Sequence, residues 1–228
     1  MINPSSLDHV ALWVADRDEL ASFLCDHLGM HVIERTDSFT LVGVDARRGK
    51  LTLFAAEGPR EPGVLERVVL RASDLERAVA ALPDSIRPER TPDGVVTFGG
   101  PQGLGLGLAS SGAGPEYDLD HVVLRVPDPE RTARGLSQLG FARRDGQLAV
   151  ADRHVRLEEG VAPTTERPLL NHLALLIESA AELEAEARRR GLEVDDVVDA
   201  PNTLAVFLWG PDRIKLEYVE HKPGFALK

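Results

Sequence analysis

Hydrophobic and polar positions repeat one pattern four times along the chain. Each repeat opens with a short run in which apolar residues alternate with others, and these runs are LDHVALWV from Leu7, LERVVLRA from Leu65, LDHVVLRV from Leu119 and LNHLALLI from Leu170. An alternation with a period of two residues predicts a β-strand. Apolar residues at helical spacing then predict helices over residues 17–28, 75–82, 129–139 and 180–190. Their expected N-caps are Asp16, Ser73, Asp128 and Ser179.

Strand-like segments follow each helix, so each repeat reads as one strand, one helix and about three further strands in roughly 45–55 residues. A unit of this size has one apolar sheet face that it cannot bury alone, and units should therefore pair. The segment 110–118, SSGAGPEYD, is rich in glycine and is the best linker. We predict an α+β fold with two domains, residues 1–110 and residues 118–228, each made of two units.

The charge, the apolar runs and the cysteine content of the chain limit its binding partners and its location in the cell. The 228 residues carry 26 Lys and Arg against 37 Asp and Glu, a net charge of −11, which argues against a nucleic-acid partner or an acidic membrane surface. The apolar runs are too short for a membrane helix, and the first residues do not have the pattern of a signal peptide. The single cysteine, Cys25, excludes an internal disulfide. We therefore expect a cytoplasmic protein.

The strand alternation places three metal-capable side chains on equivalent faces. His121 lies opposite the apolar Val122 and Leu124 in its strand, and His172 and Glu217 have the same setting in theirs. If these faces curl toward one another, the three side chains converge. Two imidazoles and one carboxylate are the ligands of non-haem Fe(II) enzymes. The alternative for a single histidine is an ordinary packed or surface residue, but three equivalent positions favour a site.

These features carry a family resemblance. The openings DHVAL, ERVVL, DHVVL and NHLAL and the closing GPDRIKLEY resemble the vicinal oxygen chelate superfamily, which includes glyoxalases, bleomycin- and fosfomycin-resistance proteins and type I extradiol dioxygenases. The likeness extends over nearly the whole chain. It implies four βαβββ modules, paired into half-open U-shaped sheets with helices on the outside.

The resemblance also implies a set of ligands, closest to that of the extradiol dioxygenases. These enzymes hold iron only in their C-terminal half, at the positions that His121, His172 and Glu217 occupy here. In the N-terminal half, Arg67 and Gly107 stand where a histidine and a glutamate would be needed. We therefore expect no metal in residues 1–110. His9 is then interpreted as a remnant of duplication.

The extradiol enzymes also use residues that do not bind the metal but take part in the reaction, and this sequence matches them only in part. His154 occupies the place of a histidine that interacts with dioxygen or moves a proton, which suits an imidazole. The alternative is a solvent-exposed histidine on an edge strand. The usual module-four tyrosine is replaced by Phe207, and the usual histidine falls near Asp199. Asp199, Asn202 or Thr203 could substitute only if the loop turns them inward.

Three functions follow for comparison. The first is an Fe(II)-dependent extradiol-type dioxygenase, with Mn(II) or another divalent metal as alternatives. Its partners would be dioxygen and a catechol-like aromatic lying against Phe207, Trp209 and Val123, with Arg125 and Lys215 as candidates for an anionic group. The second is a glyoxalase-like metal-dependent lyase or isomerase, which usually has four protein ligands. The third is a non-enzymatic protein that binds a drug or metabolite. A homo-oligomer is compatible with all three.

Overall fold

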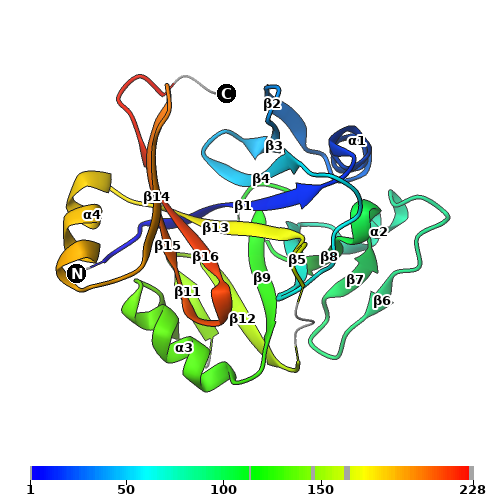
Figure 1. Cartoon of the computed structure of the whole chain (residues 1–228). Helices are drawn as coiled ribbons and strands as arrows, with labels where there is room; N and C mark the ends of the chain where they lie inside the picture. The colour runs from blue at the N-terminus through cyan, green and yellow to red at the C-terminus, as the bar shows by residue number, and fades with distance from the viewer. Residues whose placement is uncertain (1, 113, 145–146, 162–164, 226–228) are drawn as a thin grey trace.

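The computed structural model describes residues 2–112, 114–144, 147–161 and 165–225. Four βαβββ modules follow one another along the chain (Figure 1). Their strands form two eight-stranded sheets, and the helices are few and short. The predicted α+β class with βαβββ modules is therefore confirmed.

The first two modules have the following elements. Module one contains β1 (Ser6–Val14), α1 (Arg17–His27), β2 (His31–Arg35), β3 (Phe39–Asp45) and β4 (Arg48–Ala55). Module two contains β5 (Leu65–Ala72), α2 (Leu75–Ala80), β6 (Glu89–Arg90), β7 (Val96–Gly99), the 3₁₀ turn η1 (Pro101–Gly103) and β8 (Gly105–Ser110).

The last two modules repeat this order. Module three contains β9 (Leu119–Val126), α3 (Pro129–Gln138), β10 (Ala142–Arg144), β11 (Gln147–Val150) and β12 (Arg153–Glu159). Module four contains β13 (Leu170–Leu176), α4 (Ala180–Arg189), β14 (Val194–Asp199), β15 (Thr203–Trp209), the turn η2 (Pro211–Arg213) and β16 (Lys215–His221).

Side-chain caps fix where the four helices begin. Asp16 accepts hydrogen bonds from the backbone N–H groups of Asp18 and Glu19. Asp128 and Ser179 cap α3 and α4 in the same way. In module two the helix starts at Leu75 as predicted, but its cap is Asp74 rather than Ser73. A carboxylate that accepts from the N–H three residues on satisfies an otherwise unpaired donor of the first turn.

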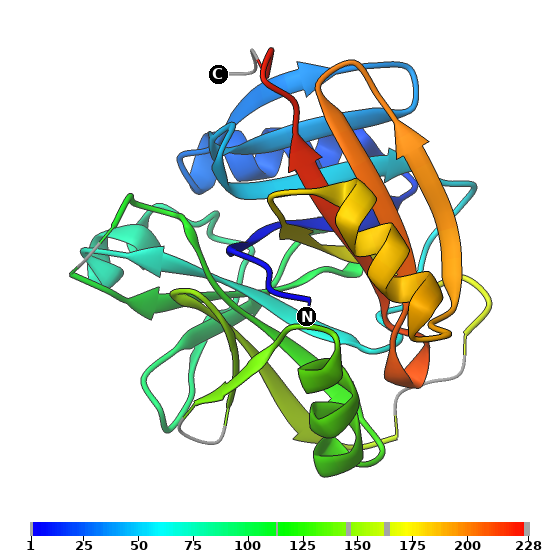
Figure 2. The ribbon, with the colours of Figure 1, turned by 90° about the vertical axis from the view of Figure 1, so that its left-hand side faces the viewer.

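The modules pair differently from the expectation. The first sheet has the order β14-β15-β16-β13-β1-β4-β3-β2, so module one joins module four. The second sheet has the order β10-β11-β12-β9-β5-β8-β7-β6, so module two joins module three. Figure 2 shows the blue and orange strands of the first sheet above the cyan and green strands of the second. The predicted division into residues 1–110 and 118–228 therefore needs correction, because each sheet takes one module from either half.

The connections between modules explain this pairing. The glycine-rich segment 110–118 joins β8 to β9, and those two strands belong to the same sheet. The chain changes sheets in the connections after β4 and after β12, which meet in a bridge between Glu61 and Pro168. All four opening strands have the same apolar alternation, so pairing by either scheme would bury the same kind of face.

A buried ion pair ties the two sheets together. The guanidinium of Arg153, 4% exposed, lies 2.9 Å from a carboxylate oxygen of the fully buried Asp118. The same guanidinium donates to the backbone oxygen of Leu7 in β1 at 3.0 Å. One continuous apolar core contains residues of both sheets. In the described part of the chain, no helix is long and apolar enough to span a membrane.

Candidate metal centre

The strand register of the first sheet brings three metal-capable side chains to one concave face. In β1, Val10 and Leu12 are buried in the core, and the alternation turns His9 to the opposite face. Strand β1 runs antiparallel to β13, with His9 opposite Ala174. Ala174 in turn lies beside Glu217 in the parallel strand β16.

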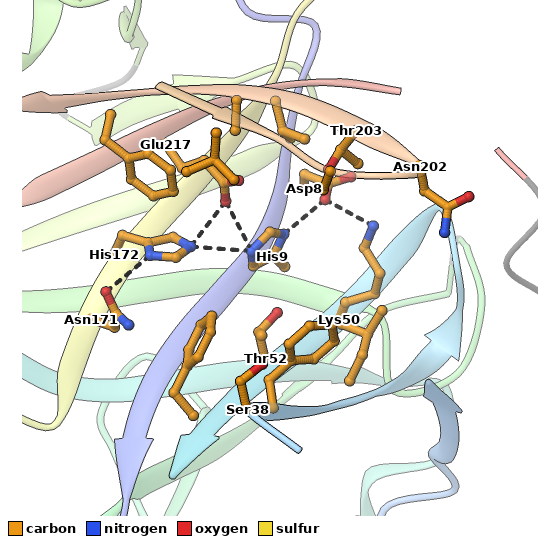
Figure 3. A pocket seen from close by; sticks show the side chains of 18 of the residues that line it. Asp8, His9, Ser38, Lys50, Thr52, Asn171, His172, Asn202, Thr203 and Glu217 are labelled. Carbon is orange, nitrogen blue, oxygen red and sulfur yellow. Dashed lines mark hydrogen bonds and ion pairs between the residues drawn. The ribbon is translucent and has the colours of Figure 1, made fainter. Parts of the chain in front are cut away.

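His9, His172 and Glu217 meet at this point (Figure 3). The carboxylate Oε2 of Glu217 is 2.9 Å from His172 Nε2 and 3.2 Å from His9 Nε2. The two Nε2 atoms are 3.3 Å apart. All three ligand atoms lie within 4.8 Å of one another, and the described residues form this one cluster of three potential ligands. His172 and Glu217 are buried and His9 is nearly so.

Outer partners hold both imidazoles so that Nε2 faces the centre. His9 Nδ1 is 2.9 Å from Asp8 Oδ2, and His172 Nδ1 is 3.1 Å from Asn171 Oδ1. Both partner atoms accept hydrogen bonds, so Nδ1 donates in each case and Nε2 is the nitrogen left to bind a cation. An oxygen acceptor behind a histidine is the usual arrangement around a metal ligand. Asp8 is itself held by the buried Lys50, whose Nζ is 2.8 Å away.

The cluster fits a cation. Oε2 of Glu217 is buried and forms no hydrogen bond of acceptable geometry, although it is close to both imidazoles. The two Nε2 atoms and this oxygen lie around one small space, and buried polar atoms rarely lack a partner without a reason. Two imidazoles and one carboxylate are suitable donors for Fe(II), Mn(II) or Zn(II).

Burial and the neighbouring charges shift the pKa values of all three residues of the centre. Burial alone would raise the pKa of Glu217, but the neighbouring His172 and His9 hold it well below its usual range. Burial would lower the pKa of His9, yet the hydrogen bond to Asp8 and the charge of Glu217 raise it to about 9. Burial lowers the pKa of His172. A divalent cation must therefore displace a proton from His9, and its binding will depend on pH.

The internal symmetry of the sheet identifies a fourth position. Glu217 lies beside the residue two places after His172, and Thr52 of β4 lies beside Ala11, two places after His9. Thr52 is therefore the counterpart of Glu217 in module one. A carboxylate there would make a four-ligand set, and the threonine leaves that side of the centre without one.

The strands of the second sheet pair in the same register, but different side chains occupy the positions equivalent to the metal centre. Its four equivalent positions are held by Arg67, Gly107, His121 and Arg156. A β-carbon on Gly107 would lie 3.1 Å from Val69 and 3.2 Å from Val95, so a carboxylate side chain there would require these valines to shift. Two guanidinium groups repel a metal ion. His121, predicted as a ligand, is therefore not beside His172 and Glu217, and His9 stands in its place.

A cavity of about 580 Å³ opens onto the centre. Three of the residues predicted to bind substrate line it, namely Phe207, Lys215 and Asn202. Residues of module one that the sequence did not indicate also line it, notably Phe39, Phe54, Thr52, Lys50 and Asp8.

The other predicted site residues lie elsewhere. Asp199 is at the surface and forms an ion pair with Lys222. Trp209 lines a neighbouring cavity. His154 and Val123 belong to the second sheet, where His154 pairs with His121 across β12 and β9. Arg125, also in that sheet, is 2.9 Å from a carboxylate oxygen of Glu66.

One signal could have indicated His9. The segment LDHVALWV has its histidine and its preceding aspartate where LDHVVLRV has them. The interpretation of His9 as a remnant depended on Arg67 and Gly107, which lie in the other sheet.

Comparisons with known proteins concern the family of the first part of the chain and the fold of the whole. Residues 6–103 match the model of the Glyoxalase/Bleomycin resistance protein/Dioxygenase superfamily. No curated protein sequence matches the chain. The predicted resemblance is confirmed over those residues by the family model, and the fold of the whole chain agrees with it.

Solved structures share the fold at low identity. A "putative dioxygenase" from Bacillus subtilis is 16% identical with a TM-score of 0.78, over 99% of this chain and 88% of its own. Glyoxalase I from Zea mays is 18% identical with a TM-score of 0.74, over 94% and 92%. The cppA protein of Streptococcus pneumoniae is 15% identical with a TM-score of 0.66, over 96% and 100%. This superfamily contains metalloenzymes of more than one reaction type.

Proposed function

We propose that the protein is an Fe(II)-dependent dioxygenase that opens a catechol-like aromatic ring beside its diol. The observation that carries this proposal is the ligand set: two histidines, one glutamate, and Thr52 at the fourth symmetric position. A set of three protein ligands leaves open positions for a two-oxygen substrate and for dioxygen. Glyoxalase-like chemistry usually has a carboxylate at the fourth position, and that carboxylate is missing here.

His9, His172 and Glu217 would hold the iron. When bound, Fe(II) supplies Lewis acidity and redox chemistry to a diol and dioxygen. In the overall reaction both atoms of dioxygen enter the product, and one ring carbon–carbon bond next to the diol breaks. The reaction needs no external reductant.

Aromatic side chains on both sides of His172 suit a planar substrate. The ring centre of Phe207, in β15, is 5.2 Å from that of His172. The ring centre of Phe54, in β4 of module one, is 6.2 Å from that of His172. Phe39 packs on Phe54 with ring centres 5.8 Å apart. Such rings provide apolar contact and restrict the ring plane of a bound aromatic.

Proton transfer is assigned to His221, because His154 belongs to the second sheet. His221 lines the cavity, and its Nε2 is 3.5 Å from Asp8 Oδ1, a buried oxygen without a hydrogen bond. Burial lowers the pKa of His221, so the imidazole is neutral near pH 7 and can accept a proton from a diol.

The test is oxygen consumption. Protein reconstituted anaerobically with Fe(II) is expected to consume dioxygen with at least one member of a catechol panel and to form a yellow ring-opened product. Protein with His172→Ala should do neither. Activity with Ni(II) or Zn(II) on an α-ketoaldehyde adduct, with no oxygen uptake, would instead favour the isomerase. Equal and negligible metal content in the wild type and His172→Ala would favour simple ligand binding.

A further inference from the structure

The cavity beside the metal centre contains lysines whose charges are already neutralised. Lys50 is 3% exposed, and its Nζ lies 2.8 Å from Asp8 Oδ2 and donates to the backbone oxygen of Ala46 at 2.8 Å. A buried ammonium held by a buried carboxylate has no free charge for a substrate.

Lys215 is neutralised at the other side of the centre. Its Nζ is 2.7 Å from Asp195 Oδ2 and 4.6 Å from the ring centre of Trp209. Asp195 also accepts a hydrogen bond of 2.8 Å from the indole N–H of Trp209. The hydrogen bond from Lys215 holds the pKa of Asp195 below its usual value, so the carboxylate stays charged at neutral pH.

Lys215 lies where a substituent on the substrate would pass. Lys215 and Glu217 occupy successive inward positions of β16, which places their Cα atoms roughly 7 Å apart. Both side chains line the cavity. A side arm of three or four atoms on a ring bound at the centre can therefore reach Lys215.

The rest of the wall does not favour an anion. Glu34 and Asp196 line the same cavity, and neither forms an ion pair with a side chain that the structure describes. The protein as a whole carries a net charge of −11. Phe39, Phe54 and Phe207 provide apolar surface. Carboxylates at the wall and a negative net charge repel an anionic ligand on approach.

We propose that the site selects a diol whose ring substituent is uncharged, and that Asp195 is the specificity-determining residue because it neutralises Lys215. Under this proposal Lys215 would not bind the anionic group that was considered for it from the sequence. The inference rests on the proposed function for the diol, but the selectivity is a property of binding and is measured without turnover.

The experiment uses two ligands of the same shape that differ in charge. These are 3-(3,4-dihydroxyphenyl)propanamide and 3-(3,4-dihydroxyphenyl)propanoate, titrated anaerobically by calorimetry into the full-length protein loaded with Fe(II). The wild type is expected to bind the amide about tenfold more tightly than the carboxylate. With Asp195→Asn the carboxylate should gain about fivefold to tenfold in affinity, and the amide should change little.

A double variant separates charge from shape. Asparagine retains an oxygen that can accept from Trp209, so Asp195→Asn should fold as the wild type does. Adding Lys215→Met should remove the gain for the carboxylate. Equal binding of both ligands by the wild type, failure of Asp195→Asn to respond, or no binding of either ligand would overturn the proposal. So would stronger binding of the matched amine, 3,4-dihydroxyphenethylamine, because that would show a preference for positive charge.

The two proposals fail in different ways. If the protein binds the amide selectively but consumes no dioxygen, the ring-cleavage proposal fails and the selectivity stands. If it consumes dioxygen equally well with both ligands, the selectivity fails and the dioxygenase stands.

Discussion

His9 and His172 face each other with their Nε2 atoms 3.3 Å apart, although 163 positions of sequence separate them. They lie on β1 and β13, the opening strands of the first and last modules, which pair antiparallel at the middle of one sheet. The candidate metal centre therefore exists only because the two ends of the chain fold into the same sheet.

Loss of His9 should abolish tight metal binding, and loss of His121 should not. His9→Ala removes one of three donors, so the affinity for Fe(II) or Mn(II) should fall by more than the roughly 10–100-fold that follows loss of an outer hydrogen bond. Divalent metal should raise the melting temperature of the wild type and of His121→Ala, but not that of His9→Ala. Because His121 is the register equivalent in the second sheet, it is a matched control. If metal stabilised His9→Ala but not His121→Ala, the metal site would have to be assigned to the second sheet.

Thr52→Glu should convert the three-ligand centre into one with four. A second carboxylate adds negative charge beside the cation, and the affinity for divalent metal should rise by about tenfold or more. Oxygen uptake should fall, because one open position is filled. Thr52→Gln has the same length without the charge and serves as control. Equal metal affinity in the two variants would show that Thr52 does not face the centre.

His221→Gln should lower kcat for oxygen uptake by roughly 10²–10⁴-fold, the usual contribution of a general acid or base. Metal content should stay at the wild-type level, because His221 is not in the ligand cluster. His154→Gln is the control and should retain activity, since His154 lies on β12 in the other sheet. If His154→Gln were the inactive variant, the assignment of proton transfer would have to be reversed.

Arg153→Ala should strongly destabilise the fold. The substitution removes the guanidinium that lies 2.9 Å from the buried carboxylate of Asp118, and breaking a buried ion pair costs about 3–5 kcal/mol of unfolding free energy. Arg143→Ala breaks an exposed pair with Glu130 and should cost less than about 1 kcal/mol. Urea unfolding of metal-free protein measures both. Similar losses would mean that Arg153 does not join the sheets.

The stability of the second sheet should fall at low pH, because Arg71 forms ion pairs with the carboxylates of Asp120 and Asp152. Burial would raise the pKa of Asp120, but hydrogen bonds from His121 and Arg71 lower it, and Asp152 is lowered in the same way. A folded-state pKa below the unfolded value of about 4 gives stabilisation that is complete above that pH and is lost as the pH falls below it.

The corresponding variant is Arg71→Met. It should lose about 1–3 kcal/mol of unfolding free energy at pH 7, and its difference from the wild type should shrink below pH 4. Arg90→Met, which removes an exposed pair with Glu76, should differ little from the wild type at either pH. A constant deficit of Arg71→Met across this range would rule out the carboxylates as its cause.

Much of the local structure could be predicted from the chain. Strand alternation correctly indicated that each opening strand buries its apolar face, as in β9, where Val122 and Leu124 are fully buried. Helix spacing and capping residues located the helices within a few positions, although the cap of α2 is Asp74 rather than Ser73. These features depend on neighbours a few residues away, which the sequence contains directly.

The partners of the opening strands could not be predicted in this way. His172 and Glu217 belong to one module, and their proximity follows from the βαβββ unit itself. The third donor depended on whether β1 or β9 lies beside β13. Both strands have the same alternation and the same histidine, so local pattern cannot distinguish them.

The sequence by itself determined the four modules, their strands and helices, and the face on which each histidine lies, because a period of two residues fixes direction within a strand. Only the tertiary structure decided that module one pairs with module four, and therefore that His9 rather than His121 stands beside His172 and Glu217. The physical reason is that strand pairing across more than 150 residues depends on long-range packing and on connections such as the bridge between Glu61 and Pro168, which no short stretch of sequence records.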